Sequence, residues 1–155
     1  MDKKFTINYD GLTKEDAKKW VLNEPDNTML KLAENSGKFF ANIEELKNNF
    51  NGKEKKIDQK LTTSQIRAIF TKLKEIDTKG IEDNEANFLM LKPLVAYASG
   101  RHNKEGLKKF KDNIINPGVD AVLDGEGNIK MKFKNFVKLL EAVLAYHKAY
   151  GGKDK

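Results

Sequence analysis

Apolar residues recur at intervals of three and four along most of this chain, which is the periodicity of an amphipathic helix. One helix is expected from Thr62 to about Asp77, with apolar positions at Ile66, Ile69, Phe70, Leu73 and Ile76. Another is expected before Gly151, with apolar positions at Phe133, Phe136, Val137, Leu140, Val143 and Leu144. Each stripe lies on one side of its helix, so both helices should bury one face in a common core.

The stretch from Ala86 to Ala98 has a different pattern, because only Asn87, Lys92 and Pro93 in it are neither apolar nor aromatic. A helix without a polar face is expected to be covered on most sides, which predicts that this stretch, Leu94 included, forms the centre of the core. Pro93 removes a backbone donor and crowds the preceding turn, so the helix should bend near Lys92. Gly100 should end it, because glycine adopts the left-handed conformation found after helices.

The residues up to position 60 are expected to form short helices separated by turns. Thr13 and Asp16 have the spacing of a capping box, and further helices are expected at residues 29–33 and 38–50. Residues 51–60 read NGKEKKIDQK, which is polar and charged throughout. This composition predicts a linker between the N-terminal part and the main part of the chain.

Alternation of apolar and polar residues, the sign of a half-buried strand, is weak everywhere, and only Phe5–Tyr9 and Ile129–Phe133 are short candidates. We therefore predict an all-α fold, a compact helical bundle of about five core helices with an extra helical N-terminal segment. A chain of 155 residues is long enough for one core and short for two. Residues 1–155 are expected to form a single domain.

The composition limits the chemistry and the environment of the chain. The sequence contains no cysteine, so it has no disulfide framework and no cysteine-based zinc site, which fits a reducing cytoplasm. Its first residues lack the apolar region of a signal peptide, and no apolar run approaches the roughly 20 residues of a membrane helix. We expect a soluble cytoplasmic protein with no membrane contact.

The balance of charge is basic, with 29 Lys and Arg against 23 Asp and Glu, and most of the excess lies after residue 60. Such a surface suits a polyanion such as nucleic acid, and it is equally the surface of a soluble lysine-rich protein. Helical spacing places Arg67 with Lys74 on one face. A second set shares a face after residue 100 and consists of Arg101, Lys104, Lys108 and Lys111. Positions 67 and 101 are the only arginines, and both stand beside cap or turn signals that would hold a guanidinium in place for phosphate.

Motifs for catalysis or metal binding are weak. The loop Asp124–Asn128, DGEGN, has the oxygen spacing of a calcium loop, but Ile129 and Asn135 stand where that loop needs glycine and glutamate. An exposed turn is therefore expected. His102 and His147 have no carboxylate or serine at a spacing that marks a catalytic set, and His147 lies in line with apolar positions, as a packing histidine would. We expect no enzymatic activity, no catalytic residues, no metal and no cofactor.

Three stretches of the chain form a combined pattern, namely LTTSQIRAIF at 61–70, LVAYASGR at 94–101 and EAVLAYHKAYGG at 141–152. In their order and intervals they resemble the small subunit of type III-A CRISPR effector (Csm) complexes. The resemblance covers residues 60–152 and leaves residues 1–60 as a divergent segment. It implies a non-catalytic helical bundle of the prokaryotic cytoplasm that stacks in several copies in an antiviral ribonucleoprotein. Its partners would be the guide RNA and target RNA, other effector-complex subunits and further copies of itself.

Matching these motifs position by position implies RNA contacts at Arg67, Arg101 and Lys148. Helix geometry adds Lys74, Lys104 and Lys108 as further candidates. Tyr97 and Tyr146 belong to the same motifs but are expected to pack in the bundle and to hydrogen-bond through their hydroxyls. In such a complex base pairing reads the sequence, so the protein needs to recognise only backbone shape and charge. The alternative is a helical protein–protein adaptor with a basic surface and no RNA contact; a nuclease is disfavoured, because acids and histidines do not cluster.

Overall fold

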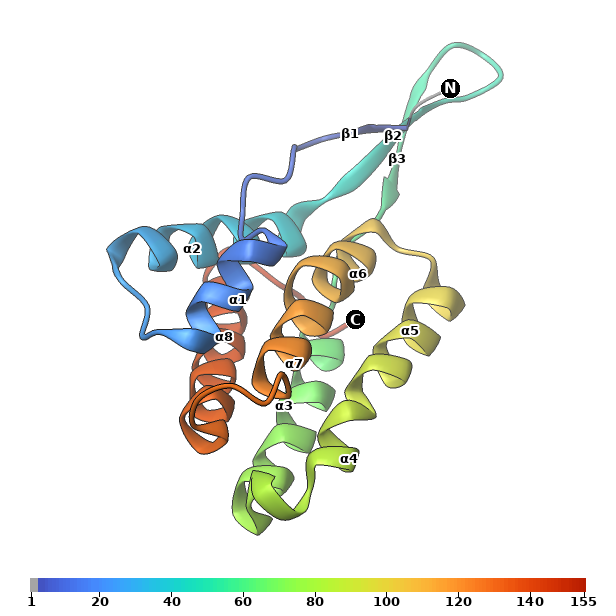
Figure 1. The fold of residues 1–155 in the computed structure, drawn as a ribbon. Coiled ribbons are helices and arrows are strands. Elements are labelled where there is room, and N and C mark those ends of the chain that lie inside the picture. Colours follow the sequence, from blue (N-terminus) through green and yellow to red (C-terminus); the bar gives the residue numbers. More distant parts are fainter. Residues whose placement is uncertain (1–2) are drawn as a thin grey trace.

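The computed structural model describes residues 3–155, and the chain in this range is mostly helical with a small sheet (Figure 1). The helices are α1 Lys14–Leu22, α2 Asn27–Asn42, α3 Thr63–Lys79, α4 Glu85–Leu89, α5 Leu91–His102, α6 Glu105–Phe110, α7 Asn116–Val122 and α8 Ile129–Ala149. The strands are β1 Lys4–Phe5, β2 Glu44–Asn48 and β3 Glu54–Asp58. A 3₁₀ turn at Ile81–Asp83 follows α3, and a π-helical turn at Lys111–Ile115 joins α6 to α7.

The C-terminal helix α8 is the centre of the fold. It packs against α1, α2, α3 and α7, and its apolar positions Phe133, Phe136, Leu140 and Val143 are buried, as predicted. The most extensive packing is between α2 and α8, where Gly37 faces Tyr146 without room for a Cβ atom. The N-terminal helices α1 and α2 therefore share the main core with α8.

Two capping boxes begin helices where the sequence predicts them. Thr13 and Asp16 cap α1, and the Thr62 hydroxyl oxygen accepts from the Gln65 backbone N–H at 3.1 Å while the Gln65 side chain accepts from the Thr62 N–H at 2.9 Å. These bonds satisfy backbone donors that have no partner inside the helix. The predicted helix that begins at residue 62 is confirmed as α3.

The prediction of a purely α-helical fold is wrong, because residues 44–58 form an antiparallel hairpin instead of the end of a helix and a linker. The helix predicted at residues 38–50 stops at Asn42, and Ile43 is buried with extended backbone. The turn of the hairpin contains Asn51 and Gly52, and Gly52 has a φ of 73°. An Asn-Gly pair is a strong hairpin signal, and it outweighs the helical spacing of the preceding apolar residues. The third strand, β1, pairs with β2.

The predicted position of residues 86–98 at the centre of the core is also wrong. The segment is interrupted at Met90, between α4 and α5, and it lies at one edge of the bundle (Figure 1). One side is buried through Phe88, Leu91 and Val95, whereas Leu94 is 46% exposed and Tyr97 is 69% exposed. The packing expected of Leu94 and Tyr97 is therefore absent.

The end of this segment differs from the prediction as well. Gly100 lies within α5, which continues to His102, and Asn103 takes the left-handed conformation with a φ of 50°. The second strand candidate, Ile129–Phe133, is the first turn of α8. Within residues 3–155 the chain contains no helix with the length and apolar character needed to span a bilayer.

Candidate nucleic-acid interface

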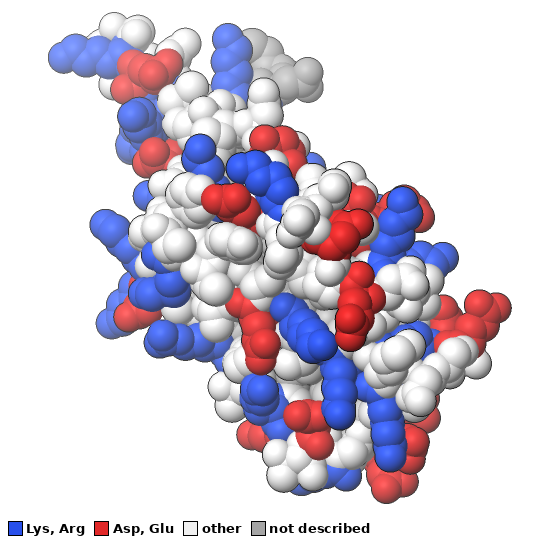
Figure 2. All heavy atoms as spheres, turned by 90° about the vertical axis from the view of Figure 1, so that its left-hand side faces the viewer, with Lys and Arg blue, Asp and Glu red and all other residues white. Residues whose placement is uncertain are grey.

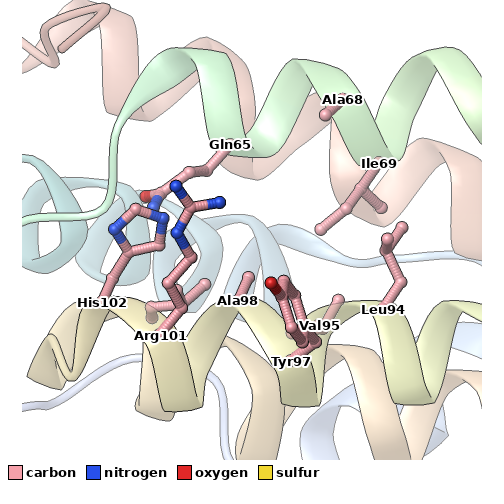
Figure 3. A pocket seen from close by; sticks show the side chains of 10 residues that line it. Gln65, Ala68, Ile69, Leu94, Val95, Tyr97, Ala98, Arg101 and His102 are labelled. Atoms are coloured by element: carbon pink, nitrogen blue, oxygen red, sulfur yellow. The ribbon is translucent and has the colours of Figure 1, made fainter.

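The first turn of α3 lies between the C-terminal ends of α5 and α8. On the α8 side, the Thr63 hydroxyl oxygen is 3.4 Å from Nδ1 of His147. On the α5 side, Gln65 lines a groove together with Arg101 and His102, whose side chains point toward it (Figure 3). Segments around residues 63, 101 and 147, which are far apart in the sequence, thus meet at one end of the molecule.

Arg67 and Lys74 lie on the side of α3 that borders α8. They are seven residues apart and share a helix face, and the Lys74 Nζ is 3.6 Å from Oε1 of Glu141 on α8. Both side chains are exposed. Lys148 lies seven residues beyond Glu141 on the exposed side of α8, where its Nζ is 3.3 Å from the Gly152 carbonyl oxygen and 3.8 Å from a carboxylate oxygen of Asp154. These three cations therefore lie along the junction of α3 and α8.

Further lysines, which were not predicted from the sequence, extend the row of cations at the α3–α8 junction along α8. Lys130, Lys134 and Lys138 are exposed and recur every four residues, on the same helix face as Glu141 and Lys148. The sequence contained a signal for this row, because these lysines recur at helical spacing on a face separate from the apolar stripe. We call the set the α3/α8 basic face, which consists of Arg67, Lys74, Lys130, Lys134, Lys138 and Lys148.

The α3/α8 basic face is a local feature of a surface with mixed charge. Seen from the side that carries α2 and α8, basic side chains spread over much of the molecule with acidic side chains between them (Figure 2). On the basic face itself, Lys130 pairs with Glu82 at 3.8 Å and Lys74 pairs with Glu141. Exposed pairs of this kind are weak and exchange readily for other anions.

The other predicted cations form a separate group at the α5–α6 connection. Arg101 lies in the last turn of α5, on the opposite flank of α3 from Arg67. Lys104 donates from Nζ to the Asp58 carbonyl oxygen at 2.8 Å and so ties the start of α6 to the end of β3. Lys108 is half-buried on α6. The structure therefore does not bring the six predicted residues into one patch.

An open apolar groove of about 250 Å³ separates α3 from α5. The sides of the groove are formed by Ile69 from α3 and by Leu94, Tyr97 and Ala98 from α5 (Figure 3). Arg101 lies at one end, so the groove is apolar along its length and basic at that end.

The two histidines have different surroundings. His147 is fully buried, and its Nε2 lies 2.6 Å from the Leu61 carbonyl oxygen. Burial lowers the pKa of this imidazole, and the neighbouring charge of Lys148 lowers it further. His102 is exposed at the end of α5. Over the described part of the chain, no three His, Asp or Glu side chains come together as metal ligands would.

The DGEGN loop uses its first carboxylate within the fold. Asp124 Oδ1 accepts from Nζ of Lys132 at 2.6 Å and from the Glu126 backbone N–H at 2.9 Å. Lys132 is buried, so Asp124 neutralises a cation that α8 carries inward. The bond from Lys132 lowers the pKa of the Asp124 carboxyl.

Comparison with known families decides what kind of chain this is. The family model described as Csm2 Type III-A matches residues 42–153. The chain belongs to the Csm2 family. It is accordingly a small subunit of a type III-A CRISPR effector complex and works there with other subunits. No curated protein and no solved structure matches it.

The Csm2 match confirms the resemblance found in the three sequence motifs and extends it toward the N-terminus. It begins at residue 42 instead of residue 60, so it includes the β2–β3 hairpin. All six predicted contact residues lie inside the match, whereas β1, α1 and most of α2 lie before it. The divergent part of this Csm2 chain is thus residues 1–41, and within it α1 and α2 supply part of the core.

Proposed function

We propose that this subunit contacts the backbone of the guide RNA–target RNA duplex, stacks in several copies along the complex, and does not itself cut RNA. The observation that carries the RNA contact is the α3/α8 basic face. From Lys130 to Lys148 the face runs for roughly 27 Å along the helix axis. On α8, Glu141 is the one acidic residue at the exposed positions in line with these lysines, and its carboxylate is paired with Lys74.

A row of cations on a rigid helix suits recognition of an RNA backbone. Lysine and arginine neutralise phosphates, and binding is favoured by release of counterions whatever the base sequence. Guide pairing supplies the sequence specificity, so base contacts by the subunit are unnecessary. Arg67 and Lys148 lie on this face, and Arg101 with Lys108 would meet the backbone from the other flank of α3. Lys104 has a lesser part in this proposal, because it binds Asp58.

Stacking is supported by the apolar surface of α4 and α5. Leu89, Met90, Leu94 and Tyr97 are exposed there, beside the groove between α3 and α5. Exposed apolar residues that cluster mark protein contacts in many soluble proteins. We propose that this surface meets a neighbouring copy of the subunit. The same surface supports the adaptor alternative, in which the chain contacts proteins but not RNA.

The test is target-RNA binding by complexes rebuilt with variant subunits at about 50 and 200 mM salt. Changing Arg67 and Arg101 to alanine singly should weaken binding by about 1–3 kcal/mol each, the scale of a charge-assisted hydrogen bond. The double change R67E/R101E should weaken it further by repulsion and should reduce the dependence on salt.

The matched control is K14E/K19E, which makes the same change of charge at two exposed positions of α1. It should leave RNA affinity unchanged. If R67E/R101E complexes assemble normally and keep the parent affinity and salt dependence, the arginines do not contact RNA and the adaptor function becomes the better account. Cleavage of RNA by the purified subunit with magnesium would contradict the non-catalytic role.

A further inference from the structure

The β2–β3 hairpin projects from the helical body (Figure 1). Its tip presents an aromatic side chain, that of Phe50, to solvent. The tip turn is held by Asn49, whose Oδ1 accepts from the backbone N–H groups of Asn51 at 3.0 Å and Lys53 at 2.9 Å. The Asn49 N–H also donates to the Lys53 carbonyl oxygen at 2.8 Å. Phe50 sits in this ordered turn, fully exposed.

The outer half of the hairpin is strongly basic. Residues 47–56 contain one acid, Glu54, and four lysines, which are Lys47, Lys53, Lys55 and Lys56. All four are exposed, and within residues 3–155 none of them takes part in an ion pair. The projecting end at the top of Figure 2 carries blue basic side chains with red acidic ones beside them.

Two of these lysines stand directly opposite each other. Lys47 on β2 pairs with Lys55 on β3 in the antiparallel register. Like charges at opposed positions destabilise a sheet. At the base of the hairpin the acids are already engaged, because Glu44 pairs with Lys60 at 3.9 Å and Asp58 with Lys104. Within residues 3–155 these four lysines are therefore in excess over Glu54, the one acid of the outer half.

We propose that the hairpin tip binds single-stranded RNA, with Phe50 stacking on an unpaired base and Lys47, Lys53 and Lys55 holding the adjacent phosphates. An aromatic side chain among cations is the usual means of binding a single strand without reading its sequence. One RNA strand supplies both a π-face and closely spaced anions. A purely apolar partner would desolvate four lysines without pairing them. A duplex would leave Phe50 without an accessible base face, because its bases are already stacked.

This contact goes beyond the proposed duplex contact and does not require the α3/α8 basic face. It differs also in the chemistry it uses, because base stacking on Phe50 does not weaken with salt as phosphate contacts do. The two RNA contacts can therefore succeed or fail separately.

The experiment measures binding of the full chain to a fluorescein-labelled oligouridylate of about 12 nucleotides by anisotropy. Replacing Phe50 with alanine should weaken binding by about 5-fold to 100-fold, the contribution of base stacking, while F50W should retain it. K47E/K55E should weaken binding and reduce its salt dependence. Leu30→Ala is the control, since it removes an exposed apolar side chain from α2, outside both proposed RNA contacts, and should leave the affinity unchanged.

A second measurement uses tryptophan fluorescence. Trp20 is the only tryptophan of the parent chain and is buried, so F50W adds an exposed reporter at the tip. Saturable quenching by oligouridylate in F50W, and its absence in an L30W variant with the reporter on α2, would place the strand at the hairpin. An RNA duplex of the same length should quench F50W much less.

Three results would overturn the proposal. One is a parent chain that does not bind oligouridylate at low salt. Another is equal affinity of the parent, F50A and K47E/K55E chains. The third is that hairpin variants keep their RNA affinity but fail to assemble with the other subunits, which would assign the tip to a protein partner. Target-RNA binding by the R67E/R101E complex is measured separately. A negative result there would contradict the duplex contact and would leave the hairpin contact unaffected.

Discussion

Nε2 of His147 lies 2.6 Å from the carbonyl oxygen of Leu61, and this contact joins the end of α8 to the residue before the α3 cap. A carbonyl oxygen only accepts, so Nε2 carries the proton. Nδ1 then has a free lone pair in the neutral ring, 3.4 Å from the Thr63 hydroxyl, which can donate to it. The buried, neutral imidazole therefore fixes the junction on which the predicted cations are arranged.

The first prediction is that the free energy of unfolding falls as the pH is lowered through 6.5. The usual pKa of histidine is 6.5, and burial lowers that of His147 in the folded chain. Below pH 6.5 the unfolded chain takes up a proton at this position, whereas the folded chain does so only at lower pH. The unfolded state then binds more protons, so stability decreases. Urea denaturation at about pH 7.5 and 5.5 measures the difference.

His102 is the control for this pH dependence. It is exposed, so H102Q should keep the loss of stability between the two pH values. H147Q should lower stability at neutral pH and remove most of the pH dependence. An H147Q chain with the parent pH dependence would show that another group is responsible.

The second prediction separates two leucines that the sequence placed together in the core. Leu140 is fully buried, so L140A should cost about 2–5 kcal/mol through lost burial and the cavity left behind. Leu94 is 46% exposed, so L94A should cost less than about 1 kcal/mol. Denaturant melts of both variants measure the costs. Equal losses of unfolding free energy in L140A and L94A would mean that Leu94 is buried in solution.

The third prediction concerns two glycines in helices. A Cβ on Gly37 would lie 2.6 Å from Cβ of Tyr146 and 2.7 Å from the backbone nitrogen of His147, so G37A must push α2 away from α8. It should destabilise by about 1–3 kcal/mol. A Cβ on Gly100 meets nothing within 4 Å, so G100A should stabilise by about 0.5–1 kcal/mol. A thermal melt in which G37A is as stable as the parent would contradict the close α2–α8 packing, and one in which G100A is less stable would contradict the open surroundings of Gly100.

The sequence predicts α3 well because a capping box precedes one continuous apolar stripe, and it predicts the buried face of α8 from the stripe alone. The start of α8 was not predicted, because Ile129–Phe133 was a strand candidate. The prediction fails at Ile43. The apolar residues after Phe39 and Phe40 keep helical spacing in the sequence, but the helix ends at Asn42 and a strand begins at Glu44. Periodicity cannot mark this end, because Ile43 is buried in either conformation. The Asn51-Gly52 pair was the available signal for the hairpin, and its meaning depends on the residues on both sides.

The segment 86–98 fails for another reason. Its composition indicates burial on all sides, but in this stretch Phe88, Leu91 and Val95 are buried and Ala98 is partly buried against the core, while the other apolar residues are exposed. Leu94 is apolar but exposed, and a single sequence does not distinguish exposed apolar residues from those of the core. For the candidate RNA contacts, helical spacing placed Arg67 with Lys74 correctly. It could not show that Arg101 lies across α3 from them, since that depends on tertiary packing.

The last prediction is that a charge on the apolar surface of α5 prevents stacking without unfolding the chain. Leu94 lines the groove between α3 and α5, so L94D places a carboxylate where the proposed neighbouring copy packs. Burying that carboxylate without a partner is costly, so fewer copies should join each complex, as counted by native mass spectrometry. The control is L30D, because Leu30 is 37% exposed on α2, outside the groove and outside the α3/α8 basic face, and should give the parent copy number. Melting temperatures of both variants should stay near that of the parent. If L94D complexes contain the parent number of copies, the α5 surface is not the stacking contact and another face of the subunit must supply it.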